Sequence, residues 1–414
     1  MNRRTSRTLL MLVIAGVLSA FAALMAIYPS AALSSAVRGL SIWWDVLFPS
    51  LLPFFIISEA LLGFGIVHFI GALLDPVMRP LFRVPGIGGF VVAMGYASGY
   101  PVGAKLTTRL RADRLVTREE GERLIAFTST SDPIFLIGAV AVGFFGNAGL
   151  ALILAAAHYG AGLIIGIMMR FHASASPMTP SSSAIRDFEG FLFRRAFQAM
   201  HQARRQDGRS LGTLLRDAIG SSLRLMTVVG GLVVFFSVLM EMLACIGVMH
   251  IIDSLLQSDL ALFHLSPSLA PAFSGGLFEV TLGAKGAGAA DAAGLRSQVV
   301  AAAWILSWAG LSVHAQIASI MNECDMRYLP FLAARVLHSL LAAGAAYFLF
   351  PLLAPYTAEA AIWFPSQMWT EAYAPWETAW HSLRGGLWTL LAVCGLLFAA
   401  SLLCVAWQRM RNSR

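Results

Sequence analysis

The sequence predicts an all-α polytopic membrane protein with about eight transmembrane helices and two re-entrant hairpins, arranged as an inverted repeat. Three observations lead to this prediction: an apolar composition, a repeated glycine-rich segment that ends in lysine, and the distribution of arginine among the loops. The 414 residues are 58% hydrophobic and 12% charged, with a mean hydropathy of +0.73. Soluble domains contain about 25% charged residues, so this composition places the chain in a lipid bilayer.

The repeat is visible in a few distinctive residues. The tripeptide Gly-Ala-Lys occurs twice, and its lysines, Lys105 and Lys285, are the only two in the sequence and lie 180 positions apart. Three further residues recur 182 positions downstream: Glu59, Gly65 and His68 return as Glu241, Gly247 and His250. Recurrence at a nearly constant spacing indicates an internal repeat, with one short deletion between the paired features.

Apolar runs of about 20 residues predict the spanning helices. These runs cover about 8–28, 46–70, 121–146, 149–169, 223–248, 297–321, 331–353 and 385–407. Residues 30–44 end in Trp43-Trp44, which predicts a helix lying in the membrane interface. The first run follows three arginines like a signal peptide, but it exceeds the roughly 7–15 apolar residues of a signal sequence and predicts a retained span, with cleavage as the alternative.

Two apolar segments, 84–105 and 267–288, are interrupted by glycine and proline. Irregular backbone at membrane depth is tolerated only where protein or a cavity covers it, so both are expected to be re-entrant hairpins. Two spans are also expected to unwind, at 128–133 and near 307–316, where hydroxyl groups, proline and glycine compete with helical hydrogen bonds. Thr117 and Glu120 form a predicted capping box before the first of these spans.

The predicted organisation has five regions. They are the first span with the interfacial helix (1–45), repeat unit one (46–169), an Arg-rich cytoplasmic loop (170–216), repeat unit two (217–353), and an extracytoplasmic loop with the last span (354–414). Within the loop, the basic stretch 184–209 is expected to form a solvated or surface-lying helix, in preference to a partner-binding motif, and it carries no assigned role.

Arginine falls in the loops of one side, which the positive-inside rule makes cytoplasmic together with both termini. This holds only if both glycine-rich segments are re-entrant. An odd number of spans then separates the two units, so they are inverted relative to each other. Inverted repeats with broken helices that meet near the midplane are the architecture of secondary transporters.

Charged and hydroxyl residues at the breaks are the candidate site. Lys105 and Lys285 are expected to bind an anionic substrate as a cationic pair if both reach the centre, with anchoring at the interface as the alternative. Four acidic residues in the membrane are candidates for coupling or charge balance: Glu59, Glu241, Asp132 and Glu279. The candidate hydrogen-bonding residues at the two breaks are Ser98, Tyr100, Thr128, Ser129, Ser131, Ser312, His314 and Gln316.

Other function classes receive no support from the sequence. The four cysteines show neither a CxxC motif nor Cys/His metal spacing, so no metal site or cofactor is predicted. No phosphate-binding motif or nucleophile–base arrangement predicts an enzyme. The net charge of +7 comes from loop arginines and does not indicate nucleic-acid binding. The expected partners are a small anionic substrate and the bilayer, and a homo-oligomer is possible.

Several motifs resemble those of the YlbJ, or SpoVV, family of sporulation integral membrane proteins, which carry the nucleoside-recognition (Gate) domain. These motifs are Pro49-Ser50-Leu51-Leu52-Pro53-Phe54-Phe55, Leu81 to Gly86, Ser98 to Lys105, and Phe127 to Pro133. The resemblance covers nearly all of the chain. It implies transport of dipicolinic acid from the mother cell across the outer forespore membrane, and it transfers no binding residue. The alternatives are transport of a nucleoside or another small metabolite, and a non-transporting role in assembly of the spore envelope.

Overall fold

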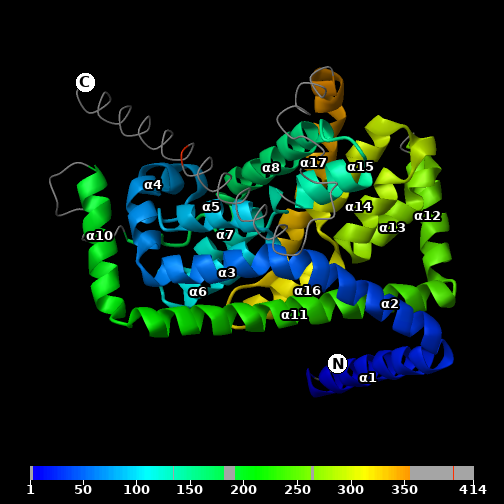
Figure 1. Cartoon of the computed structure of the whole chain (residues 1–414), viewed down its shortest axis with the longest axis horizontal. Helices are drawn as coiled ribbons and strands as arrows, with labels where there is room; N and C mark the ends of the chain where they lie inside the picture. Colours follow the sequence, from blue (N-terminus) through cyan, green and yellow to red (C-terminus); the bar gives the residue numbers. More distant parts are fainter. Residues whose placement is uncertain (1–2, 134, 181–191, 263–264, 355–394, 396–414) are drawn as a thin grey trace.

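The computed structural model describes residues 3–133, 135–180, 192–262, 265–354 and 395 (Figure 1). Every regular element among these residues is helical, which confirms the predicted all-α polytopic class. Within the described part of the chain, four helices are long and apolar enough to cross a membrane, or up to six if each of two bent pairs counts as one span. The expected last span at 385–407 lies almost wholly outside the described residues.

The described helices follow one another in two similar series. The first contains α1 (Arg3–Ile27), α2 (Pro29–Ser41), the π-helix η1 (Ile42–Leu47), α3 (Phe48–Gly63), α4 (Ile66–Phe82), α5 (Gly88–Ser98), α6 (Tyr100–Ala112), α7 (Arg118–Thr128), the π-helix η2 (Phe135–Phe144) and α8 (Leu150–Met169). The second contains α10 (Leu192–Asp207), α11 (Leu211–Cys245), α12 (Val248–Leu262), η3 (Pro267–Leu269), α13 (Ala270–Phe278), α14 (Val280–Gly288), η4 (Asp291–Ala293), α15 (Leu295–Trp308), α16 (Gly310–Met321) and α17 (Tyr328–Leu353).

The beginning of the first series differs from the expectation. Residues 30–44 do not form a separate interfacial helix, because α2, η1 and α3 follow one another without a break over residues 29–63. The wide π-helical turn comes directly before Pro49 and Pro53, which cannot donate the usual helical hydrogen bond, and it accommodates that irregularity. The boundary expected at residue 46 therefore falls inside this helical run.

The two glycines of the sequence repeat occupy equivalent bends. The run 29–63 corresponds to α11 at 211–245 at a spacing of 182 positions. Each run is followed by a glycine in the left-handed region, Gly65 with φ 77° and Gly247 with φ 78°. At Gly65 the chain turns by 84° into α4, so the single span expected at 46–70 ends at Gly63. A backbone conformation that favours glycine explains why this residue recurs at the same place in both units.

Both glycine-rich segments form two short helices that pack on each other. The first hairpin is α5–α6 with its break at Gly99, and the second is α13–α14 with its break at Glu279. Lys105 and Lys285 therefore lie within the second helix of each hairpin. The unwinding expected at 128–133 and near 307–316 corresponds to the gap between α7 and η2 and to the break at Ala309 and Gly310.

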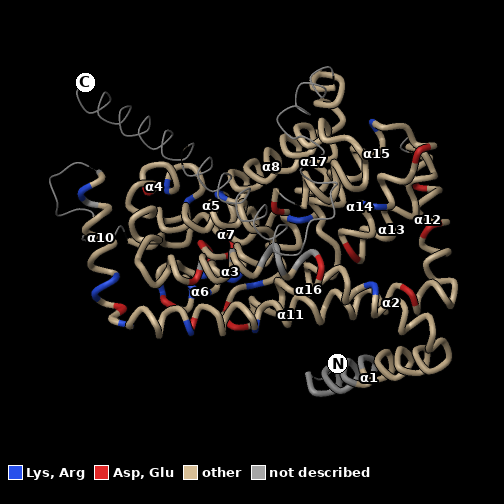
Figure 2. Tube along the Cα trace, viewed as in Figure 1, with Lys and Arg blue, Asp and Glu red and all other residues tan. Residues whose placement is uncertain are grey.

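The two units are arranged along the long axis of the molecule (Figure 1). The first hairpin, α4 and α10 lie toward one end, the second hairpin and α12 lie toward the other, and α11 runs between the ends. Lysine and arginine mark α10, whereas the charged residues of α12 are acidic (Figure 2). α10 packs on α4, where Phe197 lies 5.0 Å from Phe69 between ring centroids.

Candidate functional site

Four breaks in the helices meet in the middle of the structure, and glycine permits their close approach. A Cβ added to Gly95 or Gly103 in the first hairpin would lie 2.5 or 2.6 Å from the carbonyl oxygen of Thr128, at the end of α7. A Cβ added to Gly310 would lie 2.9 Å from the carbonyl oxygen of Phe278, at the tip of the second hairpin. Each hairpin is thus seated on the broken helix of its own unit.

A small chamber lies between the two hairpin tips. Its volume is about 50 Å³, and α11 closes one side with Val229 and Val233. The polar residues of its described lining come from both units: Tyr100, Asp132, Glu279, Thr281, Ser312 and Gln316. Five of the predicted site residues, Tyr100, Asp132, Glu279, Ser312 and Gln316, are therefore brought together here.

The two carboxylates of the chamber cap the helices that follow them. Asp132 Oδ1 accepts a hydrogen bond from the backbone N–H of Phe135 at 2.9 Å. Glu279 Oε2 accepts one from the N–H of Leu282 at 2.8 Å, at the start of α14. Each carboxylate thus satisfies one of the free backbone N–H groups at a helix N-terminus. Tyr100 donates its hydroxyl hydrogen to the carbonyl of Leu306 at 2.6 Å and links the first hairpin to α15.

The two lysines do not form the expected pair at the centre. Lys105 lines a cavity of about 470 Å³ near α6 and α10, where its Nζ lies 2.9 Å from Glu59 Oε1. Lys285 lines a different cavity of about 770 Å³ near α12. The long-range packing of the two hairpins at opposite ends keeps the lysines apart, and neither lines the chamber.

The two outer cavities are related by the repeat but carry different ion pairs. Glu59 is paired with the lysine of its own unit, whereas Glu241 lies 2.5 Å from the guanidinium of Arg38 in α2. Lys285 is exposed and lines the same cavity as Glu241. The first cavity also has a mixed charged lining: Arg109, Asp113, Asp207, Arg209, Asp217 and Glu323. Glu59 thus balances the charge of Lys105, the lysine of its own unit, whereas Glu241 balances Arg38 and not Lys285.

The remaining predicted residues lie beside the breaks, outside the described lining of the chamber. The hydroxyls of Ser98 and Ser129 are buried without a hydrogen-bond partner among the described residues. Thr128 is satisfied locally, because its hydroxyl donates to the carbonyl of Leu124 at 2.8 Å. The backbone N–H of Ser131 donates to His158 at 3.0 Å. His314 contacts the hydroxyl of Tyr328 at 2.5 Å and the carbonyl of Trp308 at 3.0 Å.

Sequence reasoning missed a buried arginine that joins the two broken helices. The guanidinium of Arg335 in α17 is fully buried and donates to the carbonyls of Ala126 and Ser129 at 2.6 Å each. It also lies 3.4 Å from the carbonyl of Ser307 in α15. These carbonyls belong to helix ends that lack helical donors, so one cation caps both units. An arginine inside an apolar span was the available signal.

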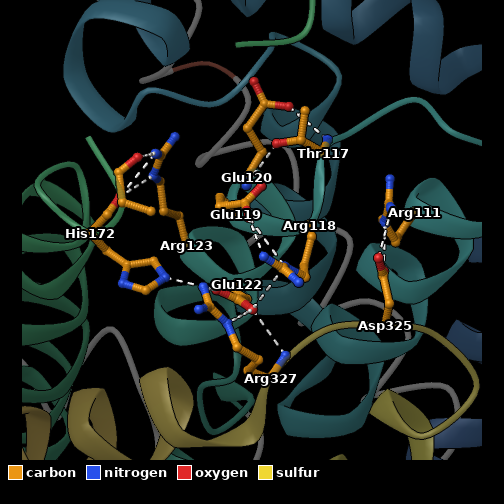
Figure 3. Close-up of polar contacts among 11 residues, drawn as sticks. Arg111, Thr117, Arg118, Glu119, Glu120, Glu122, Arg123, His172, Asp325 and Arg327 are labelled. Carbon is orange, nitrogen blue, oxygen red and sulfur yellow. Dashed lines mark hydrogen bonds and ion pairs between the residues drawn. The ribbon is translucent and has the colours of Figure 1, made fainter. Parts of the chain in front are cut away.

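A second cluster joins the units at the loop between α16 and α17 (Figure 3). The buried carboxylate of Glu122 accepts hydrogen bonds from the side chain of Arg327 at 2.7 and 2.8 Å and contacts His172 at 2.7 Å. Arg111 contacts both carboxylate oxygens of Asp325, at 2.8 and 2.9 Å. The predicted capping box of Thr117 and Glu120 is present nearby. These contacts fasten the second unit to α6 and α7 of the first.

Comparison with known proteins decides the family. The chain is 45% identical over 316 residues to the sporulation integral membrane protein YlbJ of Bacillus subtilis, a match that covers 76% of this chain and 77% of that protein. The chain belongs to the YlbJ family. This family membership confirms that the protein is an integral membrane protein, and it agrees with the apolar helices of the structure.

Two further matches cover smaller parts of this YlbJ-family chain. Residues 45–149 match the Gate family, described as nucleoside recognition. An uncharacterized protein of Alkalihalophilus pseudofirmus is 31% identical over 91 residues, which is 22% of this chain and 19% of that protein. No solved structure gives a significant match.

Proposed function

We propose that this protein is a secondary-type membrane transporter that moves a small anionic metabolite, with dipicolinic acid as the substrate, from the mother cell across the outer forespore membrane. One observation supports transport above the others. Four helix breaks from two repeated units surround one chamber, and each unit also lines an outer cavity that contains its lysine, one near α10 and one near α12. Repeats of this kind allow a site at their interface to be reached alternately from either side.

The anionic substrate is supported by the family and by the outer cavities. Each cavity contains a lysine at an equivalent position of the repeat, and the cavity of Lys285 also contains Arg38. Dipicolinate carries two carboxylates on a planar ring, and arginine and lysine are the residues that bind such groups through charge-assisted hydrogen bonds. In this proposal the substrate moves through the cavities past the chamber, and no residue performs covalent chemistry.

A nucleoside is the second candidate substrate. The Gate match over 45–149 carries the description nucleoside recognition. A third possibility, a spore-envelope assembly protein that does not transport, predicts that neither compound moves.

The decisive experiment is uptake into proteoliposomes that contain the purified full-length chain. Labelled dipicolinate and labelled uridine are compared, with protein-free vesicles and an excess of each unlabelled compound as controls. Saturable uptake of dipicolinate, inhibited by unlabelled dipicolinate and unaffected by uridine, is the expected result. Uptake of uridine alone would identify a nucleoside, and not dipicolinate, as the substrate. Uptake of neither compound would contradict the proposed transport function.

A further inference from the structure

The chamber between the hairpin tips brings two carboxyl groups together. Two carboxylates line it, Asp132 from unit one and Glu279 from unit two, and its described lining contains neither lysine nor arginine. Glu279 is only 4% exposed. The buried guanidinium of Arg335 donates to backbone carbonyls at the break after α7. Two carboxylates that line one small chamber repel each other unless a proton or a cation lies with them.

One hydroxyl in the chamber, that of Ser312, lacks a hydrogen-bond partner among the described residues. The hydroxyl of Ser312 is buried, with the residue 2% exposed, and it has no hydrogen-bond partner among the described residues. Ser312 occupies the position of unit two that corresponds to Asp132 at the repeat spacing of 180. A buried hydroxyl normally has a partner. Its oxygen lone pairs are suitable ligands for a hard cation, as are carboxylate oxygens and the amide oxygen of Gln316.

The size of the chamber excludes an organic metabolite. A volume of about 50 Å³ exceeds the roughly 10–15 Å³ that a cavity needs to hold one water molecule, and it is far below the roughly 300–1,000 Å³ of pockets for small organic ligands. The chamber can therefore hold one small ion. A divalent metal centre is not indicated, because no group of three or more His, Cys, Asp and Glu in the described part of the chain could hold one.

We infer that the chamber is a binding site for one monovalent metal cation, represented by Na⁺, with oxygen atoms of Asp132, Glu279 and Ser312 as ligands. The ligands come from both units, so the cation links the break after α7 to the tip of the second hairpin. A Cβ on Gly99 would lie 3.2 Å from Asp132 Oδ2, so the tip of the first hairpin also touches this site. A role as the coupling ion rests on the proposed transport function, whereas binding itself does not.

The test measures cation binding by the full-length protein in detergent, without any transport assay. Equilibrium binding of ²²Na⁺ should saturate at one ion per chain. The thermal unfolding midpoint should rise as NaCl replaces choline chloride at constant ionic strength, because a ligand that binds only the folded state stabilises it. If wild-type protein binds no ²²Na⁺ and unfolds at the same temperature in both salts, the inference is wrong, and protons would then be the cations that balance the carboxylates.

Variants locate the site. Asp132→Asn and Glu279→Gln should abolish Na⁺ binding, and Ser312→Ala should raise the half-saturating Na⁺ concentration several-fold. Ser312→Ala removes a hydroxyl without a partner, so it keeps the test decisive if the carboxylate variants fail to fold. Asp259→Asn, at an exposed position of α12, is the control and should bind Na⁺ like the wild type. An unchanged Na⁺ affinity in Ser312→Ala would show that the proposed site is wrong. Na⁺ binding by a protein that takes up no substrate would contradict the transport function but not the cation site.

Discussion

The rings of His158 and His338 stack with centroids 5.0 Å apart, although 180 positions separate the two residues in the chain. This spacing equals that of Lys105 and Lys285, so the histidines are equivalent residues of the two units. Both are fully buried, and His338 contacts the carbonyl of His158 at 2.8 Å. His158 also receives the N–H of Ser131 and contacts the hydroxyl of Ser307 at 2.8 Å. The units thus meet directly beside both helix breaks.

Arg335 should be essential for the stability of these breaks. Arg335→Gln leaves carbonyls of α7 and α15 without their donors, and each unsatisfied buried group costs about 1–3 kcal/mol, so we expect a loss of roughly 2–4 kcal/mol in the free energy of unfolding. Arg335→Lys keeps the charge but cannot reach both helix ends, and it should recover only part of the loss. Val336→Ala, at an exposed neighbour on the same helix, is the control in a chemical denaturation series. Equal stability of Arg335→Gln and the control would contradict the capping role.

The ion pair of Lys105 and Glu59 should contribute measurably to stability. Both side chains are only 17% exposed, so removal of one partner leaves a largely buried charge unpaired and should cost roughly 1–3 kcal/mol. Glu59→Gln with Lys105→Gln should cost less than the sum of the single variants, which a double-mutant cycle of unfolding free energies measures. Lys285→Gln, which breaks no ion pair found among the described residues, should change stability little. Strict additivity in the cycle would show that the pair does not stabilise the fold.

Gly65 and Gly247 should differ in their tolerance of alanine. Both have a left-handed backbone, so alanine strains either bend by about 1 kcal/mol or more. At Gly65 the new Cβ would also lie 2.7 Å from the carbonyl oxygen of Met200 in α10, whereas at Gly247 no described atom beyond its chain neighbours would lie within 4 Å of it. Gly65→Ala should therefore lower the unfolding midpoint more than Gly247→Ala. The reverse order would show that α10 does not pack against this bend.

The inverted arrangement can be tested by labelling from one side. In a variant without the four native cysteines, Cys at Arg205 in α10 and Cys at Asp259 in α12 probe exposed positions at the two ends of the molecule. With the α10 end in the cytoplasm, an impermeant thiol reagent should label Asp259→Cys in sealed cells and label Arg205→Cys only after the membrane is opened. Equal labelling of both in sealed cells would place the ends on the same side.

The contact between Arg111 and Asp325 predicts a dependence of stability on pH. Hydrogen bonding by the guanidinium of Arg111 lowers the pKa of Asp325 in the loop after α16. A carboxyl whose pKa is lower in the folded state stabilises that state above its unfolded pKa, and this contribution is lost as the pH falls through the folded pKa. Arg111→Gln should therefore unfold more easily than the wild type near pH 7, with a difference that shrinks below about pH 4. A difference that stays constant down to acid pH would exclude the contribution of Asp325.

The break positions could be predicted from sequence because they depend on local backbone chemistry. Proline and a run of hydroxyl residues end α7 at Thr128, and glycine permits the tip at Gly99 with φ 89°. The sequence alone could have identified Arg335 as a candidate, since an arginine in an apolar span needs a partner or a function. The partners of Arg335 could not be predicted, because Ala126 and Ser129 lie more than 200 positions earlier in the chain.

Composition and spacing by themselves determined that this is a polytopic helical membrane protein with two repeated units, each containing a broken hairpin. Those properties follow from hydropathy and from where glycine and proline interrupt it, and neither requires a knowledge of packing. Only the tertiary structure decided that Lys105 and Lys285 occupy separate cavities and that Asp132, Glu279 and Ser312 share one chamber. Spacing along the chain shows which residues of the two units are equivalent. Whether equivalent residues contact each other depends on their distance from the interface between the units, and His158 and His338 lie at that interface.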